Sequence, residues 1–89
     1  MKEAYLEVTY RQGRPIAAYM YLPRRSGDKS CRTAVADPDL VIDFNRQGAP
    51  IGIEITAPRK VTVTSLNRVL RGLGLPPVTR ADIAPLRAA

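Results

Sequence analysis

The stretch LVIDFNRQGAPIGIEIT, residues 40–56, decides the fold. Each half alternates between apolar and other side chains, which is the pattern of a strand that is buried on one face. Turn-forming residues between the halves, residues 46–49, predict a hairpin loop. In the register that this loop sets, apolar residues face each other: Leu40 opposite Ile55, Ile42 opposite Ile53, and Phe44 opposite Ile51.

The same register assigns both carboxylates of the stretch to the opposite face of the hairpin. Asp43 lies opposite Gly52 and Glu54 lies opposite Val41, so the two acidic residues are diagonal neighbours and not a direct pair. Outward-facing strand positions explain acidic residues without any ligand. A carboxylate site formed with a nearby tyrosine is the alternative interpretation.

Two alternating segments, residues 4–10 and 16–22, predict an earlier hairpin. Gly13 can supply the left-handed position of a three-residue loop, which pairs Tyr10 with Arg14. Val8 then lies opposite Ile16, and Leu6 lies opposite Ala18. Three tyrosines share the other face with Asp43 and Glu54: Tyr5, Tyr19 and Tyr21. A charged loop, residues 23–30, leads to a short strand over residues 31–36.

After residue 58 the apolar period changes to that of a helix. Leu66, Val69, Leu70 and Leu73 form one stripe, which predicts a helix over about residues 64–73. Thr64 is the expected N-cap, and Gly74 is the expected left-handed residue after the helix end. Further along, Thr79 and Asp82 are spaced like a helix cap and its return partner, and Pro85 limits that piece to about one turn.

These elements predict an α+β domain: an antiparallel β-meander of four or five strands with a C-terminal helix packed on one sheet face. We expect one domain over residues 1–75, with the sheet over about residues 4–57. Residues 76–89 are expected to be a short C-terminal extension with one helical turn.

The stretch LVIDFNRQGAPIGIEITAP resembles the signature of the YuzE-like family, small bacterial domains of unknown function. The matching positions are Asp43, Gly48, Gly52, Ile53, Glu54 and Ile55. Residues 11–15 depart from the family pattern, because they are basic where the family has an acidic, Ala-rich run. The resemblance implies a small bacterial sheet domain, and it implies no assigned activity.

Composition excludes several kinds of chemistry. The 89 residues include no His, which is the commonest general base and a member of the serine and cysteine triads. Asp37 and Asp39 lack the ligand spacing of a calcium loop, and no phosphate-binding glycine loop is present. We therefore expect no catalytic residues, no metal site, no cofactor and no enzyme activity.

The single cysteine, Cys31, has neither a CxxC motif nor a second cysteine, which favours a reducing cytoplasm. No segment approaches the roughly 20 apolar residues of a membrane span, and the first residues do not form a signal peptide. We therefore predict a cytoplasmic protein that does not enter membranes.

We predict a non-catalytic binding or assembly module that forms a homodimer. Its expected partner face carries Tyr5, Tyr19, Tyr21, Asp43 and Glu54, since tyrosine is enriched at interfaces and a single sheet needs cover. Base stacking on the tyrosines is disfavoured, because the carboxylates on the same face would repel phosphates.

A basic nucleic-acid-associated or antitoxin-like regulator is the alternative, because the formal net charge is +6. Its expected contacts are the basic residues of the helix region and of the charged loop: Arg59, Lys60, Arg68, Arg71, Arg24 and Arg25. Two helical pieces joined by residues 72–79 resemble helix-turn-helix only loosely.

Overall fold

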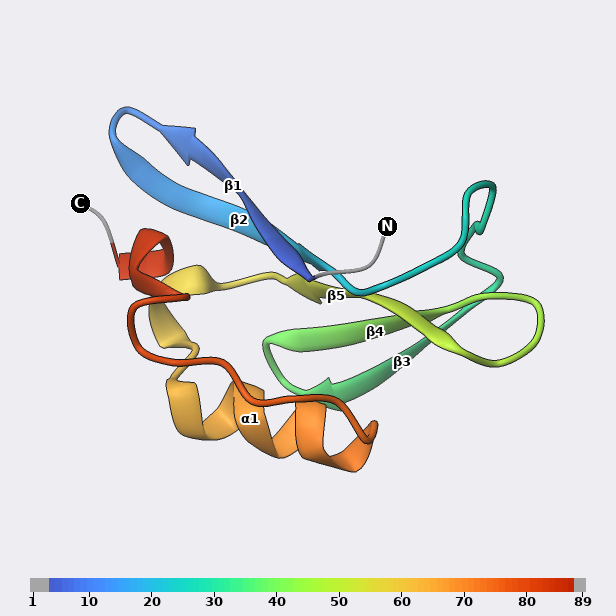
Figure 1. Ribbon diagram of the computed structural model, residues 1–89. Coiled ribbons are helices and arrows are strands. Elements are labelled where there is room, and N and C mark those ends of the chain that lie inside the picture. The colour runs from blue at the N-terminus through green and yellow to red at the C-terminus, as the bar shows by residue number, and fades with distance from the viewer. Residues whose placement is uncertain (1–3, 88–89) are drawn as a thin grey trace.

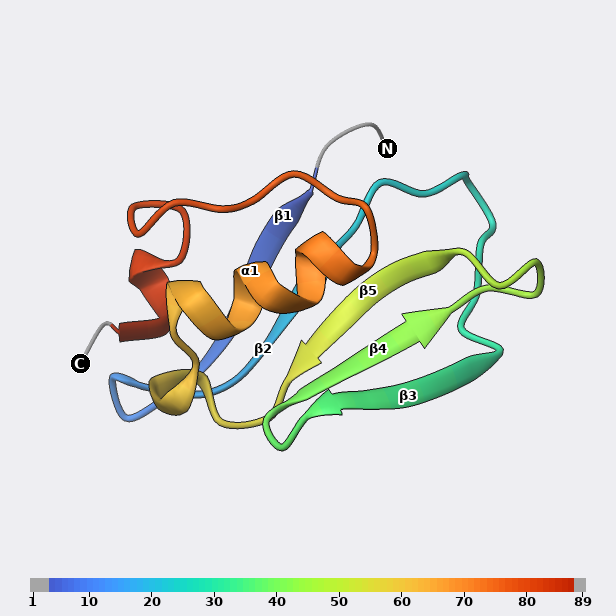
Figure 2. The same ribbon diagram turned by 90° about the horizontal axis from the view of Figure 1, so that it is seen from below.

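One antiparallel sheet and one α-helix make up the residues that the computed structural model describes, which are residues 4–87 (Figure 1). The elements in chain order are β1 (Tyr5–Arg11), β2 (Arg14–Tyr21), β3 (Arg32–Asp37), β4 (Leu40–Phe44), β5 (Pro50–Ile55), the 3-10 helix η1 (Pro58–Lys60), α1 (Val63–Gly72) and the 3-10 helix η2 (Ala84–Arg87). Figure 2 shows α1 lying across one face of the sheet. The predicted α+β class is confirmed.

The sheet has five strands in the order β1-β2-β5-β4-β3. Strands β3, β4 and β5 form a meander, but β2 pairs with β5 and not with the strand that follows it. The polar loop after β2 carries the chain to the far edge of the sheet, where β3 begins (Figure 2). This order suits the side chains, because β5 is mostly buried and needs a neighbour on each side, whereas the largely exposed β3 suits an edge.

The β4–β5 hairpin confirms most of the predicted register. Leu40 pairs with Ile55, Ile42 with Ile53, and Asp43 with Gly52. The exception is Phe44, which pairs with Pro50 because a bulge shifts the register after Asp43. Both carboxylates therefore lie on the predicted face of the hairpin.

The predicted register of the β1–β2 hairpin is wrong. Gln12 and Gly13 both have positive φ, at 52° and 78°, so they form a two-residue turn that pairs Arg11 with Arg14. A bulge then shifts the pairing, so that Val8 lies opposite Ala18 and Leu6 opposite Met20.

The extra residue of that bulge is Ile16, which is 47% exposed and not in the predicted core position. Pro15 is buried in its place. Tyr10 is also exposed, at 46%, and its hydroxyl donates to the Pro85 carbonyl at 3.0 Å.

The core fills the space between the sheet and α1. Leu40 and Ile53 from the sheet and Leu66 from the helix are among its most buried members, each with 0% exposure. Leu66, Val69 and Leu70 face this core, as the helical stripe predicts. Gly74 adopts the expected left-handed conformation, with a φ of 73°.

The N-cap of α1 is Thr62 and not the predicted Thr64. The Thr62 hydroxyl accepts from the Ser65 backbone N–H at 3.0 Å, and the Thr62 N–H donates to the Ser65 hydroxyl at 3.0 Å. This reciprocal pair is a capping box with Ser65 as its third helical residue. Thr64, the predicted cap, is instead the second residue of the helix.

Replacing the cap should therefore weaken the fold. Thr62→Ala removes the acceptor for the Ser65 N–H and should lower the free energy of unfolding by about 1 kcal/mol. Thr64→Ala is the matched control, because Thr64 is exposed in the first turn and alanine has the higher helix propensity, so this variant should be neutral or slightly more stable. Urea unfolding of both variants measures the difference, and equal costs would rule out Thr62 as the cap.

The predicted C-terminal extension packs into the same core. Ile83 and Leu86 are 2% and 0% exposed. The Thr79 N–H donates to Asp82 Oδ2 at 2.7 Å, and the Asp82 N–H donates to Thr79 Oγ1 at 3.2 Å, as the predicted spacing requires. The helical turn comes later, as η2, and residues 88–89 of the predicted extension lie outside the described residues.

Candidate functional site

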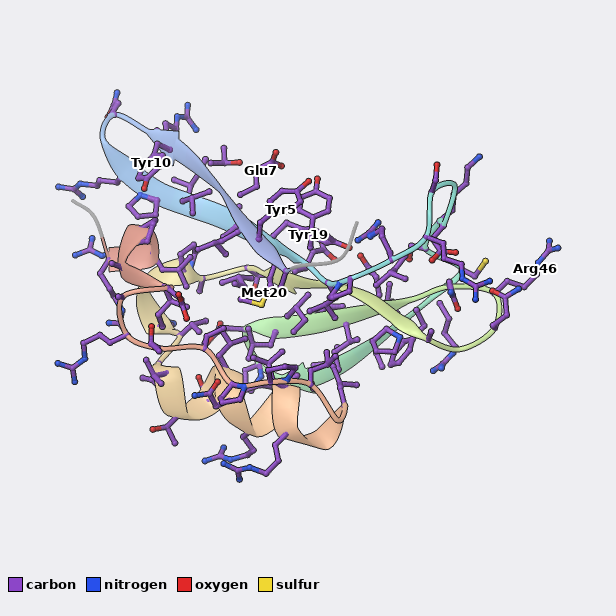
Figure 3. All side chains as sticks on the ribbon, viewed as in Figure 1. Tyr5, Glu7, Tyr10, Tyr19, Met20 and Arg46 are labelled. Atoms are coloured by element: carbon purple, nitrogen blue, oxygen red, sulfur yellow. The ribbon has the colours of Figure 1, made fainter. Side chains whose placement is uncertain are left out.

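The sheet face opposite α1 carries the predicted partner-face residues. We call it the open face, because no helix of residues 4–87 lies against it (Figure 1). Strand pairing places its side chains in two rows across the sheet: Tyr5, Tyr21, Gly52, Asp43 and Thr33 in one, and Glu7, Tyr19, Glu54, Val41 and Val35 in the other. Figure 3 shows Tyr5, Glu7 and Tyr19 on this side, whereas Met20 points toward the core.

A cluster of tyrosines dominates the β1–β2 part of the open face. The Tyr5 and Tyr21 rings stack, with centroids 4.5 Å apart and planes 14° apart. Tyr19 meets Tyr21 edge-on at 4.7 Å. The Tyr21 hydroxyl donates to Glu7 Oε1 at 3.5 Å, and the negative charge of Glu7 is the main cause that raises the pKa of Tyr21. Tyr5 remains 50% exposed, so the cluster presents aromatic surface to solvent.

Tyr19 reaches from β2 across β5 to Asp43 on β4. Its hydroxyl donates to Asp43 Oδ2 at 2.7 Å. The ring passes directly over Gly52, where a Cβ would lie only 1.8 Å from the Tyr19 hydroxyl oxygen and 2.2 Å from Cζ. Glycine is therefore required at this strand position for close approach of the ring and not for its backbone angles.

Asp43 is a buried carboxylate and not a solvated strand residue, since only 8% of it is exposed. Burial of the Tyr19 hydroxyl, followed by its hydrogen bond to Asp43, raises the pKa of Tyr19 to about 12. Glu54 is exposed on the same face, one row away. The two carboxylates thus differ in role, because Asp43 holds the aromatic ring and Glu54 is available to a partner.

Arg24 closes this network from the loop after β2. Its guanidinium donates to the Ile51 carbonyl and, at 3.5 Å, to the Tyr19 hydroxyl. The same group lies 5.2 Å from the centroid of the Tyr21 ring, within cation–π range. Arg24 therefore holds the tyrosine cluster together, which is a role that the sequence did not predict for it.

The predicted nucleic-acid contacts do not form one patch. Arg59 and Lys60 of η1, and Arg68 and Arg71 of α1, are exposed on the helix side of the molecule. Arg24 and Arg25 belong to the loop between β2 and β3, away from η1 (Figures 1 and 2). The helix-turn-helix interpretation is wrong, because α1 is the one α-helix of the described residues and the second piece is only the short η2.

The sequence offered a contact between Asp43 and Tyr19 or Tyr21 only as an alternative interpretation, and the structure shows that it is made by Tyr19. The signal for this contact was Gly52, a glycine in the interior of a strand, which often marks the close approach of another group. Among residues 4–87, no group of three or more His, Cys, Asp and Glu side chains gathers as metal ligands would. No helix of this part of the chain is long and apolar enough to cross a membrane.

No family model matches the chain, and no curated protein and no solved structure matches it either. The resemblance to the YuzE-like family therefore stays a prediction.

Proposed function

We propose that this protein is a non-catalytic assembly module whose open face pairs with the open face of a second copy. The observation that carries the proposal is the exposed apolar and aromatic surface of that face, where Tyr5 is 50% exposed and Val35 is 73% exposed. A one-layer sheet with one covered face is usually completed by another layer, and tyrosine is enriched where proteins meet.

The tyrosine cluster is rigid before any partner arrives. Tyr19 is fixed by Asp43 and packed over Gly52, and Tyr21 lies between Tyr5 and Arg24. A surface whose side chains are already ordered loses little conformational entropy on binding. This favours a docking surface over a set of solvated strand residues.

Charge on the open face is arranged so that two copies complement each other. Arg24 lies beyond the Tyr21 row at one end, and Glu7 and Glu54 lie in the Tyr19 row nearer the other end. A two-fold axis that lies in the interface and runs across the strands exchanges these ends. Each Arg24 then approaches the carboxylates of the other copy, which is the self-complementarity that a two-fold interface needs.

The proposal includes a bacterial, cytoplasmic setting. The thiol of Cys31 is free and exposed, and it would be exposed to oxidation outside a reducing compartment. The YuzE-like resemblance supports the bacterial origin and assigns no activity.

A nucleic-acid-associated or antitoxin-like regulator is the second candidate. It is supported by the segment between Glu54 and Asp82, which contains no acidic residue but includes the exposed Arg59, Lys60, Arg68 and Arg71. Binding to short duplex DNA or RNA would then weaken steeply with salt, by about one unit of log–log slope for each phosphate neutralised.

A charge placed on the open face should break the proposed dimer. Val35→Glu puts a carboxylate into the apolar part of the interface without removing any packed core atom, since Val35 is 73% exposed. We expect the dissociation constant to rise at least tenfold, roughly the cost of about 1.4 kcal/mol for desolvating an unpaired charge. Sedimentation velocity over a range of concentrations measures it.

Thr64→Glu is the matched control, because it adds the same charge on the exposed side of α1. The control should keep the mass of two chains. A parent protein that sediments as one chain at every concentration would overturn the proposal, and so would equal weakening by both substitutions.

A further inference from the structure

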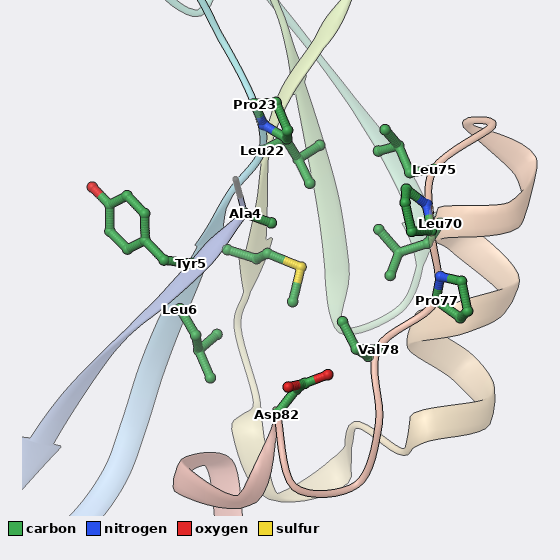
Figure 4. A pocket seen from close by; sticks show the side chains of 12 residues that line it. Ala4, Tyr5, Leu6, Leu22, Pro23, Leu70, Leu75, Pro77, Val78 and Asp82 are labelled. Carbon is green, nitrogen blue, oxygen red and sulfur yellow. The ribbon is translucent and has the colours of Figure 1, made fainter. Parts of the chain in front are cut away.

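An apolar cavity of about 420 Å³ lies on the helix side of the sheet, between β1–β2 and the segment that follows α1 (Figure 4). Its floor is formed by the core side chains Met20, Leu22 and Leu70, which are 3%, 1% and 2% exposed. The volume falls in the range of about 300–1,000 Å³ that is typical of small-molecule sites. The cavity is open to solvent at its mouth, so a ligand can reach this apolar floor.

The outer wall of the cavity is fixed in place. Asn67 of α1 accepts a hydrogen bond from the Val78 N–H at 2.8 Å and donates one to the Val78 carbonyl at 3.0 Å. The Leu75 N–H donates to the Leu70 carbonyl at 2.9 Å. Between these two anchors stand Pro76 and Pro77, whose φ angles are locked by their rings. The wall therefore cannot collapse onto the floor without losing these bonds.

One charged group faces the cavity. Figure 4 shows the Asp82 carboxylate directed into the space between Leu6 and Val78, whereas the Tyr5 ring points away from it. The Thr79 N–H donates to Asp82 Oδ2 at 2.7 Å, which fixes the orientation of the carboxylate. This bond and the Thr79 hydroxyl hold the pKa of Asp82 below its usual range, so the group is charged at neutral pH. Asp82 is exposed to solvent, so its other oxygen can accept from a ligand at the mouth of the cavity.

We propose that this cavity binds a small molecule with an apolar body and a primary ammonium group. The apolar body replaces water over Met20, Leu22 and Leu70, and the ammonium group donates to the outer oxygen of Asp82. Proline walls offer no backbone N–H, so nothing in them would favour a carboxylate or a phosphate. This site is separate from the open face and does not depend on the proposed assembly.

The test is an NMR titration of the full chain with three ligands that share one alkyl body: n-octylamine, n-octanol and n-octanoate. Amide shifts should concentrate at Leu6, Val78 and Asp82. At pH 7, we expect n-octylamine to bind about tenfold more tightly than n-octanol, because a charge-assisted hydrogen bond is worth more than a neutral one. n-Octanoate should bind more weakly than n-octanol, since its charge opposes that of Asp82.

Asp82→Asn removes the negative charge of the site but keeps the shape of the side chain. The asparagine oxygen can still accept from the Thr79 N–H, so the turn is kept. The variant should bind n-octylamine about tenfold more weakly than the parent protein does and should bind n-octanol unchanged. Equal affinities of the parent for all three ligands would overturn the proposal, as would amine-induced shifts confined to the open face around Tyr19 and Glu54.

Discussion

Gly52→Ala is expected to lower the free energy of unfolding by about 3 kcal/mol. The new Cβ would lie 1.8 Å from the Tyr19 hydroxyl oxygen and 2.5 Å from ring carbon Cε2, so the ring has to swing off β5. Tyr19 then loses its hydrogen bond to Asp43, and a carboxylate that is only 8% exposed loses its donor. An unsatisfied buried polar group costs about 1–3 kcal/mol, more if charged, and the displaced ring loses its packing as well.

Gly72→Ala is the matched control for this substitution. Gly72 is the last residue of α1, and an added Cβ there meets nothing within 4 Å. Alanine is favoured over glycine in a helix, so this variant should be neutral or slightly more stable. Guanidinium unfolding measures both changes.

A double-mutant cycle tests whether the loss of stability in Gly52→Ala comes from displacement of the Tyr19 ring. In a Tyr19→Ala background there is no ring to displace, so the further change Gly52→Ala should cost much less than it does in the parent. Additive costs would contradict the proposed packing of Tyr19 over Gly52.

Tyr19→Phe should cost about 2 kcal/mol at pH 7. The ring keeps its place over Gly52, but the hydroxyl that donates to Asp43 Oδ2 at 2.7 Å is gone. Asp43 then has one hydrogen bond fewer to offset the free-energy cost of burying its carboxylate. Tyr10→Phe is the control, because its hydroxyl bonds to Pro85 at an exposed position and should contribute less.

The difference between the parent and Tyr19→Phe should shrink at high pH. The folded protein holds the Tyr19 proton up to a pKa of about 12, whereas the unfolded chain releases it at the ordinary value of 10.0. The stability that this group contributes is therefore complete below pH 10 and is lost as the pH rises toward 12. Phenylalanine releases no proton, so a constant difference across this window would contradict the raised pKa.

Local pattern was enough to predict the elements of the fold. Period-two alternation located the strands, and the Ile-rich stretch gave the pairing of Leu40 with Ile55 and of Ile42 with Ile53. The helix stripe of Leu66, Val69 and Leu70 was also correct. In each case the signal came from burial of one face, which repeats with the period of the backbone.

The predictions of strand pairing that were wrong depended on single residues or on contacts between segments distant in the sequence. The bulge at Ile16 altered the first hairpin, and alternation alone carries no sign of an inserted residue. The pairing of β2 with β5 joins segments far apart in the chain. Local pattern does not rank such pairings, so a continuous meander was the simplest expectation.

The candidate site was predicted in part. The alternation of side chains along each strand correctly predicted that five residues share one face: Tyr5, Tyr19, Tyr21, Asp43 and Glu54. It did not reveal that Asp43 is buried, because this depends on the direction in which the Tyr19 side chain crosses β5. Arg24 contacts the tyrosine cluster, which its sequence context did not indicate, and its predicted contact with nucleic acid stays a prediction.

We propose that two copies of the protein meet through their open faces. An isotope-filtered NOE experiment on a mixture of labelled and unlabelled chains tests it most directly, because it detects only protons of different chains that lie close together. We expect intermolecular NOEs from the ring protons of Tyr5 and Tyr21 and from the Val35 methyl groups. Intermolecular NOEs that come only from α1, or none at millimolar concentration, would contradict it.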